Sequence, residues 1–321
     1  MKNNIVVGLD VGGTKLRIAS IEIKNKPIIL NEKTIFTQKV KNLAPLIRNF
    51  NNKADAACVG FAGPIVGNKA KLTNAELSVN VKKLMKETKL KEITLINDFH
   101  AIGYGVPFLS KSDFLVLNKG QGFNNNVEMV VGPGTGLGKA YIIINKVYPC
   151  EGGLTTLGIE DIEDYALVDY LKHKYSGPVY FEDVISGRGL MDIYDHLEII
   201  SNLKINFKVR NLIKEEPVNK AKLITLYSSE DQLCDMTLRI FTKFYARFVR
   251  DSALNLISSK VYLVGGISAA IKPYLKKFFI TEFLKHRKYT SLLKRVNVSV
   301  ILEQNVGLIG CGAVAGKLVQ Q

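Results

Sequence analysis

The fold of this chain is set by the stretch Gly8-Leu9-Asp10-Val11-Gly12-Gly13-Thr14-Lys15. Three apolar residues, Ile5-Val6-Val7, precede it, and an alternating apolar run over residues 16–23 follows it. This pattern predicts a strand, a tight turn and a second strand. Gly12 and Gly13 at the turn can adopt positive φ and let a ligand approach the backbone closely.

Polar groups surround this turn. Thr14 and Lys15 add a hydroxyl and a cation beside the open amides, and Asp10 comes just before the turn. A carboxylate in that place can hold a hydrated Mg²⁺ ion, and the set suits the terminal phosphates of a nucleotide. A Gly-Gly turn also closes ordinary hairpins, so further motifs must decide. The nucleotide-binding candidates here are Gly8, Asp10, Gly12, Gly13, Thr14 and Lys15, with Asp10 binding Mg²⁺ through water.

A second glycine-rich loop, Gly132 to Gly138, lies between two strand-like runs, and a third apolar strand ends in Gly265-Gly266. A dinucleotide fingerprint would need the glycines to open a helix, but β-rich sequence follows them here. The Lys-Ser or Lys-Thr ending of a P-loop is also missing. Two strand–turn–strand loops and a later Gly-Gly strand end are typical of actin-like ATPases. The further nucleotide-binding candidates are Gly132, Gly134, Thr135, Gly136, Gly265 and Gly266.

Further segments follow in a fixed order, and with them the chain resembles the bacterial-type glucokinases, a branch of the actin-like sugar kinases. The resemblance implies an α/β chain with a two-lobed actin-like ATPase (ribonuclease H-like) fold that binds ATP and sugar in the interlobe cleft. It implies a small lobe of residues 1–105, joined by a C-terminal helix at 306–321, and a large lobe of residues 106–305. The matching segments are Leu95 to Phe99, Glu151-Gly152-Gly153, Phe181 to Leu190, Ala253 to Leu256, Val264 to Ile267 and Asn305 to Ala313.

The pair Asn97-Asp98 ends an apolar strand predicted at residues 93–98. Ligands of open α/β sheets collect at the carboxyl ends of strands. Phosphorylating a sugar needs a base for the hydroxyl proton, and Asp98 is the candidate. Asn97 can donate and accept hydrogen bonds with a sugar hydroxyl. The competing interpretation is that the pair caps a helix starting near His100.

The sugar contacts follow from the resemblance. It implies that Glu151 and Glu182 bind sugar hydroxyls through charge-assisted hydrogen bonds, and Asn74 matches a substrate-loop position more loosely. The family pattern continues after Glu-Gly-Gly with a sugar-binding His, where this chain has Leu154. A site built to bond a hydroxyl discriminates strongly when one partner is missing. The sugar is therefore glucose or, as the alternative, another hexose or an amino sugar.

Composition narrows the classes of function. The chain has 321 residues, which fits two lobes better than one core. The four cysteines are scattered without zinc-type spacing, which indicates reduced thiols in a cytoplasmic protein and no zinc site. The net charge of +15 comes from dispersed basic residues, which indicates a solvated surface that attracts ATP and binds neither nucleic acid nor a membrane.

Coarse periodicity predicts the remaining elements. Three strands are expected in residues 4–38, and the long helix at 230–256 carries an apolar stripe that includes Met236 and Ile240 and is expected to be core. Further strands are expected at 56–63 and 93–98, and helices at 43–50, 79–89, 162–173, 189–196 and 307–319.

The sequence thus predicts an ATP- and Mg²⁺-dependent glucokinase that phosphorylates the 6-hydroxyl of glucose, and the resemblance implies a homodimer. A non-catalytic sugar-sensing regulator is a weaker alternative, because the first strand starts at residue 5 and leaves no room for a DNA-binding helix-turn-helix. A structural ATPase of the actin class would not need Asp98 together with Glu151 and Glu182.

Overall fold

The computed structural model describes residues 4–50, 54–72, 76–200 and 202–320. The chain packs into two compact units. The first contains residues 1–114, 140–149 and 303–321, and the second contains residues 115–139 and 150–302. The lobe boundaries predicted from the sequence, at residues 105 and 305, stay a prediction. Among the described helices, none is long and apolar enough to cross a membrane.

A five-stranded sheet forms the centre of the first unit, with the strand order β3-β2-β1-β4-β8. The predicted hairpin is confirmed, because β1 and β2 pair antiparallel in a register that places Asp10 opposite Arg17. The strands β4 and β8 continue the sheet parallel to β1, so three strands end at one edge. The bounds are β1 Ile5–Val11, β2 Lys15–Ile23, β3 Pro27–Phe36, β4 Ala56–Phe61 and β8 Glu92–Asn97.

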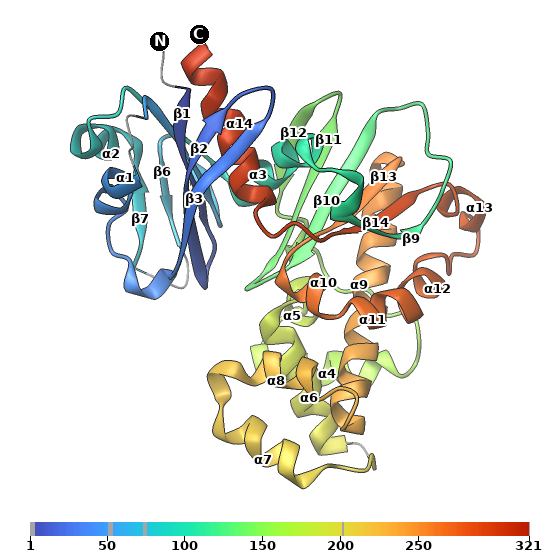
Figure 1. Ribbon diagram of the computed structural model, residues 1–321. Coiled ribbons are helices and arrows are strands. Elements are labelled where there is room, and N and C mark those ends of the chain that lie inside the picture. The colour runs from blue at the N-terminus through green and yellow to red at the C-terminus, as the bar shows by residue number, and fades with distance from the viewer. Residues whose placement is uncertain (1–3, 51–53, 73–75, 201, 321) are drawn as a thin grey trace. The chain divides into compact units, whose positions relative to one another are not determined.

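Helices cover both faces of this sheet (Figure 1). On one face, α3 and α14 approach so closely that a Cβ on Gly60 would lie 3.1 Å from the Cβ of Ala101 and 3.2 Å from the Sγ of Cys311. On the other face, α1 and α2 pack over a second core cluster. A small sheet, β5-β6-β7, was not predicted. The bounds are α1 Ala44–Phe50, α2 Val81–Thr88, α3 Asp98–Gly105, α14 Val306–Gln320, β5 Ile65–Val66, β6 Lys69–Lys71 and β7 Ser78–Asn80.

The strands β10, β13, β14 and β9 of the second unit belong to a six-stranded sheet with the order β12-β11-β10-β13-β14-β9, in which residues 140–149 of β11 and β12 are grouped with the first unit. Its central strands β10, β13 and β14 run parallel, so the loops that follow them also meet at one edge. The bounds are β9 Phe114–Asn118, β10 Val127–Pro133, β11 Leu137–Ile143, β12 Lys146–Cys150, β13 Lys260–Leu263 and β14 Asn297–Ile301.

The long helix α9 organises the rest of the second unit, with α4 to α8 around its N-terminal half (Figure 1). It begins where the Asp231 carboxylate accepts from the Cys234 amide at 2.9 Å, which caps the first turn. Its phenylalanines at 241, 244 and 248 are buried as predicted. Met236 and Ile240 are only half-buried, so their assignment to the core is wrong. The bounds are α4 Asp164–Tyr175, α5 Phe181–Val184, α6 Gly187–Ile200, α7 Phe207–Glu215, α8 Lys220–Leu226 and α9 Gln232–Leu256.

Shorter helices complete the second unit near its parallel strands. One of them, α10, follows β13 after two residues, and the residue just before it, Gly265, has a φ of +98°. A left-handed backbone favours glycine at that position. The bounds are α10 Gly266–Ala270, α11 Lys272–Tyr274, α12 Ile280–Phe283 and α13 Thr290–Leu293.

Candidate active site

The carboxyl ends of β1, β4 and β8 form what we call the acidic edge, defined by Asp10, Asn97 and Asp98. In the parallel register Asp10 lies beside Gly60, and Asn97 lies beside Phe61. Asp10 and Gly60 therefore point to the same face of the sheet, which is the face that α3 and α14 cover. The sheet thus brings the predicted magnesium ligand and the predicted base to one edge of the first unit.

Asp10 is a half-buried carboxyl between β2 and the start of α14. A Cβ on Gly307 would lie 3.0 Å from its Oδ2 atom, so a glycine keeps this space open. Loss of water around Asp10 raises the pKa of its carboxyl, and the charge of Arg17 offsets part of the rise. The Arg17 guanidinium also donates to the carbonyl oxygen of Gln304 just before α14.

The donor set at Asp10 fits Mg²⁺ bound through water. Among the described residues, no group of three or more acidic, His or Cys side chains is placed to hold a metal ion. Mg²⁺ commonly keeps several waters and binds through one or two carboxylates and the substrate phosphates. A single carboxylate beside the phosphate turn is therefore sufficient for the predicted role.

The turn between β1 and β2 is fixed by backbone hydrogen bonds. The Gly12 amide donates to the Lys15 carbonyl oxygen at 3.0 Å, and the buried Thr37 hydroxyl donates to the Gly12 carbonyl oxygen at 2.8 Å. Gly12 does not have a left-handed backbone, so this turn does not use the freedom of Gly12 to adopt positive φ. Thr14 and Lys15 are exposed at the turn, next to Gly13.

Gly8 lies earlier, inside β1, where small size serves packing. A Cβ there would lie 2.7 Å from the Cδ1 of Ile21 and 3.3 Å from the Cβ of Cys311. Its contact with a nucleotide stays a prediction.

Asn97 and Asp98 divide two tasks at the start of α3. The Asn97 Oδ1 atom accepts from the amides of Phe99 and His100 at 2.9 and 3.2 Å, so the capping interpretation is confirmed for Asn97. The helix begins at Asp98, two residues before the predicted start. The Asp98 Oδ1 atom accepts from the Phe99 amide at 3.0 Å. A carboxylate in a first helical turn is stabilised by the helix dipole, and the amide contact fixes the position of the Asp98 side chain.

The second unit carries what we call the glycine edge, defined by Gly132, Gly134, Gly136, Gly265 and Gly266. A Cβ on Gly132 would lie 2.1 Å from the Val264 carbonyl oxygen, and one on Gly265 would lie 3.1 Å from that of Pro133. At Gly134 and Gly266 a Cβ would meet nothing within 4 Å. Gly132 and Gly265 therefore allow the neighbouring segments to approach each other. Gly134 and Gly266 leave exposed backbone, and Thr135 is exposed beside Gly134.

Glu182 joins the glycine edge to the turn that carries Glu151. Its Oε2 atom accepts from the Leu137 amide at 2.9 Å. The neighbouring Phe181 amide donates to the Thr155 carbonyl oxygen at 3.1 Å, which ties α5 to residues 151–155. Glu151 and Leu154 are both exposed there, and half of the Leu154 surface is accessible. The fold of the second unit thus gathers both predicted sugar-binding glutamates near its glycine loop.

The Thr155 hydroxyl donates to the Gly152 carbonyl oxygen at 2.8 Å. The hydroxyl proton of Thr155 is therefore used within the turn, and Thr155 does not replace the hydrogen-bond donor that the family's histidine would supply at position 154. Asn74 lies outside the described residues.

The sequence analysis did not identify Lys139, which is buried beneath the turn of residues 151–155. Its ammonium donates to the Ser252 hydroxyl at 3.1 Å and lies 5.2 Å from the centre of the Phe248 ring. Burial lowers the pKa of Lys139. A Cβ on Gly152 would lie 2.6 Å from its Nζ atom, so this glycine makes room for the ammonium. The signal in the sequence is a lysine two residues after Leu137, on the buried face of the strand.

Comparison with known proteins settles the family. The family model for Glucokinase matches residues 7–318. The chain belongs to the glucokinase family. Among relatives in this family, the glucokinase of Nostoc sp. is 30% identical over 96% of this chain and 98% of its own length. The glucokinase of Synechocystis sp. is 29% identical over 98% of both chains.

Solved glucokinase structures have the same fold. A glucokinase from an Antarctic psychrotroph superposes with a TM-score of 0.79 at 25% identity and covers 98% of this chain and 99% of its own. The glucokinase of Balamuthia mandrillaris in complex with glucose gives a TM-score of 0.79 at 20% identity, covering 97% and 93%. A ROK family glucokinase from Streptomyces griseus, in complex with glucose and AMPPNP, gives 0.68 at 16% identity, covering 98% and 99%. The predicted family and the two-lobed actin-like ATPase fold are confirmed.

Proposed function

We propose that this chain transfers the γ-phosphate of ATP to the 6-hydroxyl of glucose, with Asp98 as the base. The observation that carries the proposal is the place of Asp98. It lies in the first turn of α3, at the carboxyl ends of parallel strands, in a chain whose glucokinase match covers residues 7–318. The relatives that it resembles over almost their whole length are named glucokinases.

The acidic edge supplies the groups that act on the reacting hydroxyl. Asp98 accepts the proton of the sugar hydroxyl as that oxygen attacks phosphorus. Asn97 uses its Oδ1 atom for the helix cap, so its NH₂ group is the part that bonds a sugar oxygen. Asp10 would hold the water shell of Mg²⁺, and that ion would supply positive charge to offset the charge of the nucleotide phosphates.

The glycine edge supplies backbone to the nucleotide. The open surface of Gly266 lets its amide approach a phosphate oxygen without a Cβ in the way. The Gly134 amide donates to the Gly136 carbonyl oxygen at 2.7 Å, so Gly134 contributes open space beside the phosphates. The exposed Thr135 adds a hydroxyl donor. Glu182 keeps Oε2 on the Leu137 amide, and its other oxygen accepts from a sugar hydroxyl, as does the exposed Glu151 carboxylate.

Leu154 supports a second candidate, a kinase for another hexose or an amino sugar. Its exposed alkyl group stands in the turn beside Glu151 and offers no hydrogen bond. A sugar with an apolar or bulkier substituent at that point would fit an alkyl group better than glucose would.

A coupled assay of ADP release tests both candidates. We expect turnover with glucose, compared in one panel with mannose, glucosamine and N-acetylated amino sugars. A higher kcat/KM for an amino sugar would favour the second candidate. No ADP release with any sugar, despite measurable sugar binding, would favour the non-catalytic regulator and contradict the proposal.

The proposal includes a cytoplasmic homodimer. The family resemblance supports the homodimer. The four scattered free thiols support the cytoplasm, where thiols stay reduced. Sedimentation velocity at micromolar concentration measures the oligomeric state, and a monomer at all concentrations would contradict the dimer.

A further inference from the structure

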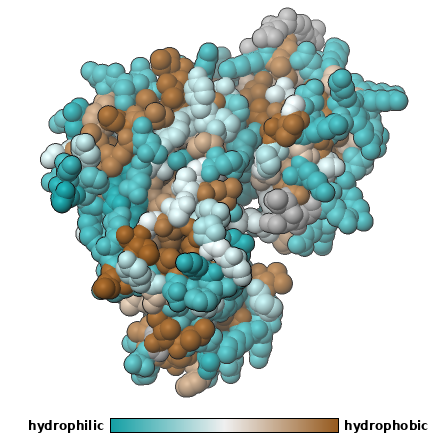
Figure 2. Space-filling model, turned by 180° about the vertical axis from the view of Figure 1, so that it is seen from behind, coloured by the Kyte–Doolittle hydropathy of each residue, from teal (hydrophilic) through white to brown (hydrophobic). Residues whose placement is uncertain are grey.

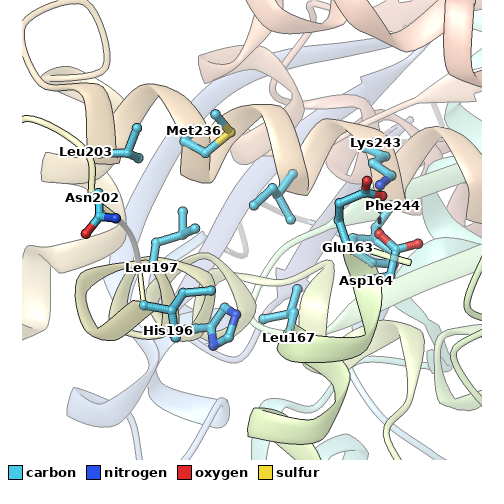
Figure 3. Close-up of a pocket in the computed structure, with 12 residues that line it drawn as sticks. Glu163, Asp164, Leu167, His196, Leu197, Asn202, Leu203, Met236, Lys243 and Phe244 are labelled. Carbon is cyan, nitrogen blue, oxygen red and sulfur yellow. Dashed lines mark hydrogen bonds and ion pairs between the residues drawn. The ribbon is translucent and has the colours of Figure 1, made fainter. Parts of the chain in front are cut away.

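A pocket of about 440 Å³ lies among the helices of the second unit, on α4, α6 and α9 (Figure 3). Its volume is within the range of small-molecule sites. The half-buried Met236 and Ile240 of α9 belong to its wall, which explains why the predicted core stripe is incomplete there. The other lining side chains are Glu163, Asp164, Leu167, His196, Leu197, Ile200, Asn202, Leu203, Lys243 and Phe244.

His196 is the polar group in the apolar part of this wall. It is 4% exposed, and its ring stacks obliquely on Tyr170 with centroids 5.1 Å apart. Its ring nitrogens have no hydrogen-bond partner among the described residues. Burial lowers the pKa of His196, so the imidazole is neutral at neutral pH. The ring lines the pocket, so a ligand with a polar atom in its apolar body can exchange a hydrogen bond with it.

The opposite part of the wall is charged. Figure 3 places Glu163, Asp164 and Lys243 together at one end of the pocket, away from Asn202 and Leu203. The Lys243 ammonium is already neutralised, because it lies 2.7 Å from Asp164 and 2.9 Å from Asp161. Arg247 also pairs with Asp164, at 2.5 Å.

Glu163 gives this end its surplus of negative charge. It is exposed at the rim, and its carboxylate has no ion pair with any described residue. The ion-pair network behind Glu163 has an excess of negative charge, because four basic side chains pair with five carboxylates. Its members are Lys243, Arg247, Arg250 and Lys285 with Asp161, Asp164, Glu160, Glu282 and Asp251. A cation is therefore the complementary charge at the rim.

We propose that this pocket binds a small amphipathic amine, with an aromatic or branched-aliphatic body among the leucines and a protonated nitrogen at Glu163. The apolar side chains of α6 and α9 bury the body. His196 exchanges a hydrogen bond with a polar atom of that body. The site lies outside the acidic and glycine edges, and it does not depend on the identity of the sugar.

Calorimetric titration of the full chain with three indoles tests the proposal, because they share a ring and differ in charge. Tryptamine is cationic, indole is neutral and indole-3-acetate is anionic. We expect saturable binding that weakens in that order. Glu163→Gln should weaken tryptamine about twofold to fivefold, as expected for an exposed ion pair, and leave indole unchanged. Glu215→Gln, at an exposed glutamate of α7 away from the pocket, should change neither.

A second pair of variants tests the location. Ile200 lines the pocket and is 55% exposed, while its neighbour Ile199 is 71% exposed and is not part of the wall. Ile200→Trp should abolish binding of tryptamine and indole, and Ile199→Trp should preserve it. Equal binding by the two variants, or complete displacement of tryptamine by ATP or glucose, would overturn the proposal.

Ile200 in the pocket wall and its neighbour Ile199 are exposed apolar side chains, and they define the remaining outcome. Hydrophobic patches stand among hydrophilic side chains at the helical end of the second unit (Figure 2). Exposed apolar residues on α6, α7, α8 and the turn before α8 include Ile199, Ile200, Phe207, Val218 and Leu226. Sedimentation velocity on the Ile200→Trp variant separates the cases. Conversion of a dimer to a monomer would show that this face binds a second copy of the chain, and would overturn the small-molecule proposal.

Discussion

The acidic edge and the glycine edge are built on the same plan but use opposite means. The order β3-β2-β1-β4-β8 of the five-stranded sheet has a counterpart in the order β12-β11-β10-β13-β14 of the six-stranded sheet. In each, three parallel strands end at one edge, where ligands of α/β proteins collect. The first edge presents carboxylates and an amide, and the second presents bare backbone. A common scaffold therefore provides two places for chemistry, and the side chains decide what each can do.

The difference has a physical basis. Burial removes water from Asp10 and raises the pKa of its carboxyl, whereas Asp98 lies in a first helical turn, where the helix dipole favours negative charge. Backbone that meets a ligand must be free of obstruction, and Gly134 and Gly266 face open space, with the Gly134 amide itself bonded to the Gly136 carbonyl oxygen at 2.7 Å. Some glycines at the second edge serve packing instead, as Gly132 shows by its approach to Val264. Substitutions should therefore act through side-chain chemistry at the first edge and through backbone space at the second.

The largest effect is expected for Asp98→Asn at the acidic edge. Loss of the base should lower kcat by about 10²–10⁴. Binding of ATP should survive, because the glycine edge is unchanged. Asp169→Asn, at an exposed aspartate of α4, is the matched control and should leave kcat unchanged. Steady-state kinetics and a nucleotide titration measure both. Retention of more than a tenth of the wild-type kcat would rule out Asp98 as the base.

At the glycine edge, Gly132→Ala and Gly134→Ala should differ in stability. The Cβ of the first would lie 2.1 Å from a backbone oxygen, and overpacking of this kind costs about 1–3 kcal/mol. The second meets open space, so its free energy of unfolding should change by no more than about 0.5 kcal/mol. Urea unfolding measures the two values. If Gly134→Ala binds ATP as tightly as the wild type, backbone space at this residue is not used by the nucleotide.

Leu154→His tests the turn that carries Glu151, one of the two predicted sugar-binding glutamates. A restored hydrogen bond is worth about 0.5–1.5 kcal/mol, so glucose should bind roughly threefold to tenfold tighter. The KM for ATP should hardly change. Ile162→His, at an exposed isoleucine of the same unit, is the control. If kcat/KM ratios across the sugar panel are identical in the Leu154→His variant and the wild type, residue 154 does not face the sugar.

The smallest effect concerns the dependence of stability on pH. Because the pKa of Asp10 is raised in the folded chain, its contribution is fully present below the unfolded value of 3.8 and is lost as pH rises through the folded pKa. Asp10→Asn should remove this loss and raise Tm slightly at neutral pH.

Asp113→Asn is the control of opposite sign. Hydrogen bonds from Ser110 lower the pKa of Asp113, so its stabilisation is present above 3.8 and lost as pH falls through the folded pKa. Melting curves from pH 3 to pH 8 compare the two. A lower Tm for Asp10→Asn at neutral pH would contradict the desolvation of Asp10.

Much of this chain was predictable because its signals are local. The alternation after Lys15, the apolar stripe of the long helix and the Asn-Asp pair all act over a few residues, and β2, α9 and the cap of α3 formed accordingly. Errors occur where distant segments meet. The packing of Gly8 could not be read from its motif, because a Cβ there would lie 3.3 Å from the Cβ of Cys311, which lies near the other end of the chain.

The sequence by itself determined the family, the two strand–turn–strand loops and the residue types at both edges, because these depend on composition and spacing along the chain. The tertiary structure decided which glycines are open and which are packed, since that depends on contacts such as Gly132 with Val264. It also decided that Lys139 is buried under the Glu151 turn and that Met236 faces a pocket. Both outcomes depend on what lies across the fold, and no pattern along the chain specifies that neighbour.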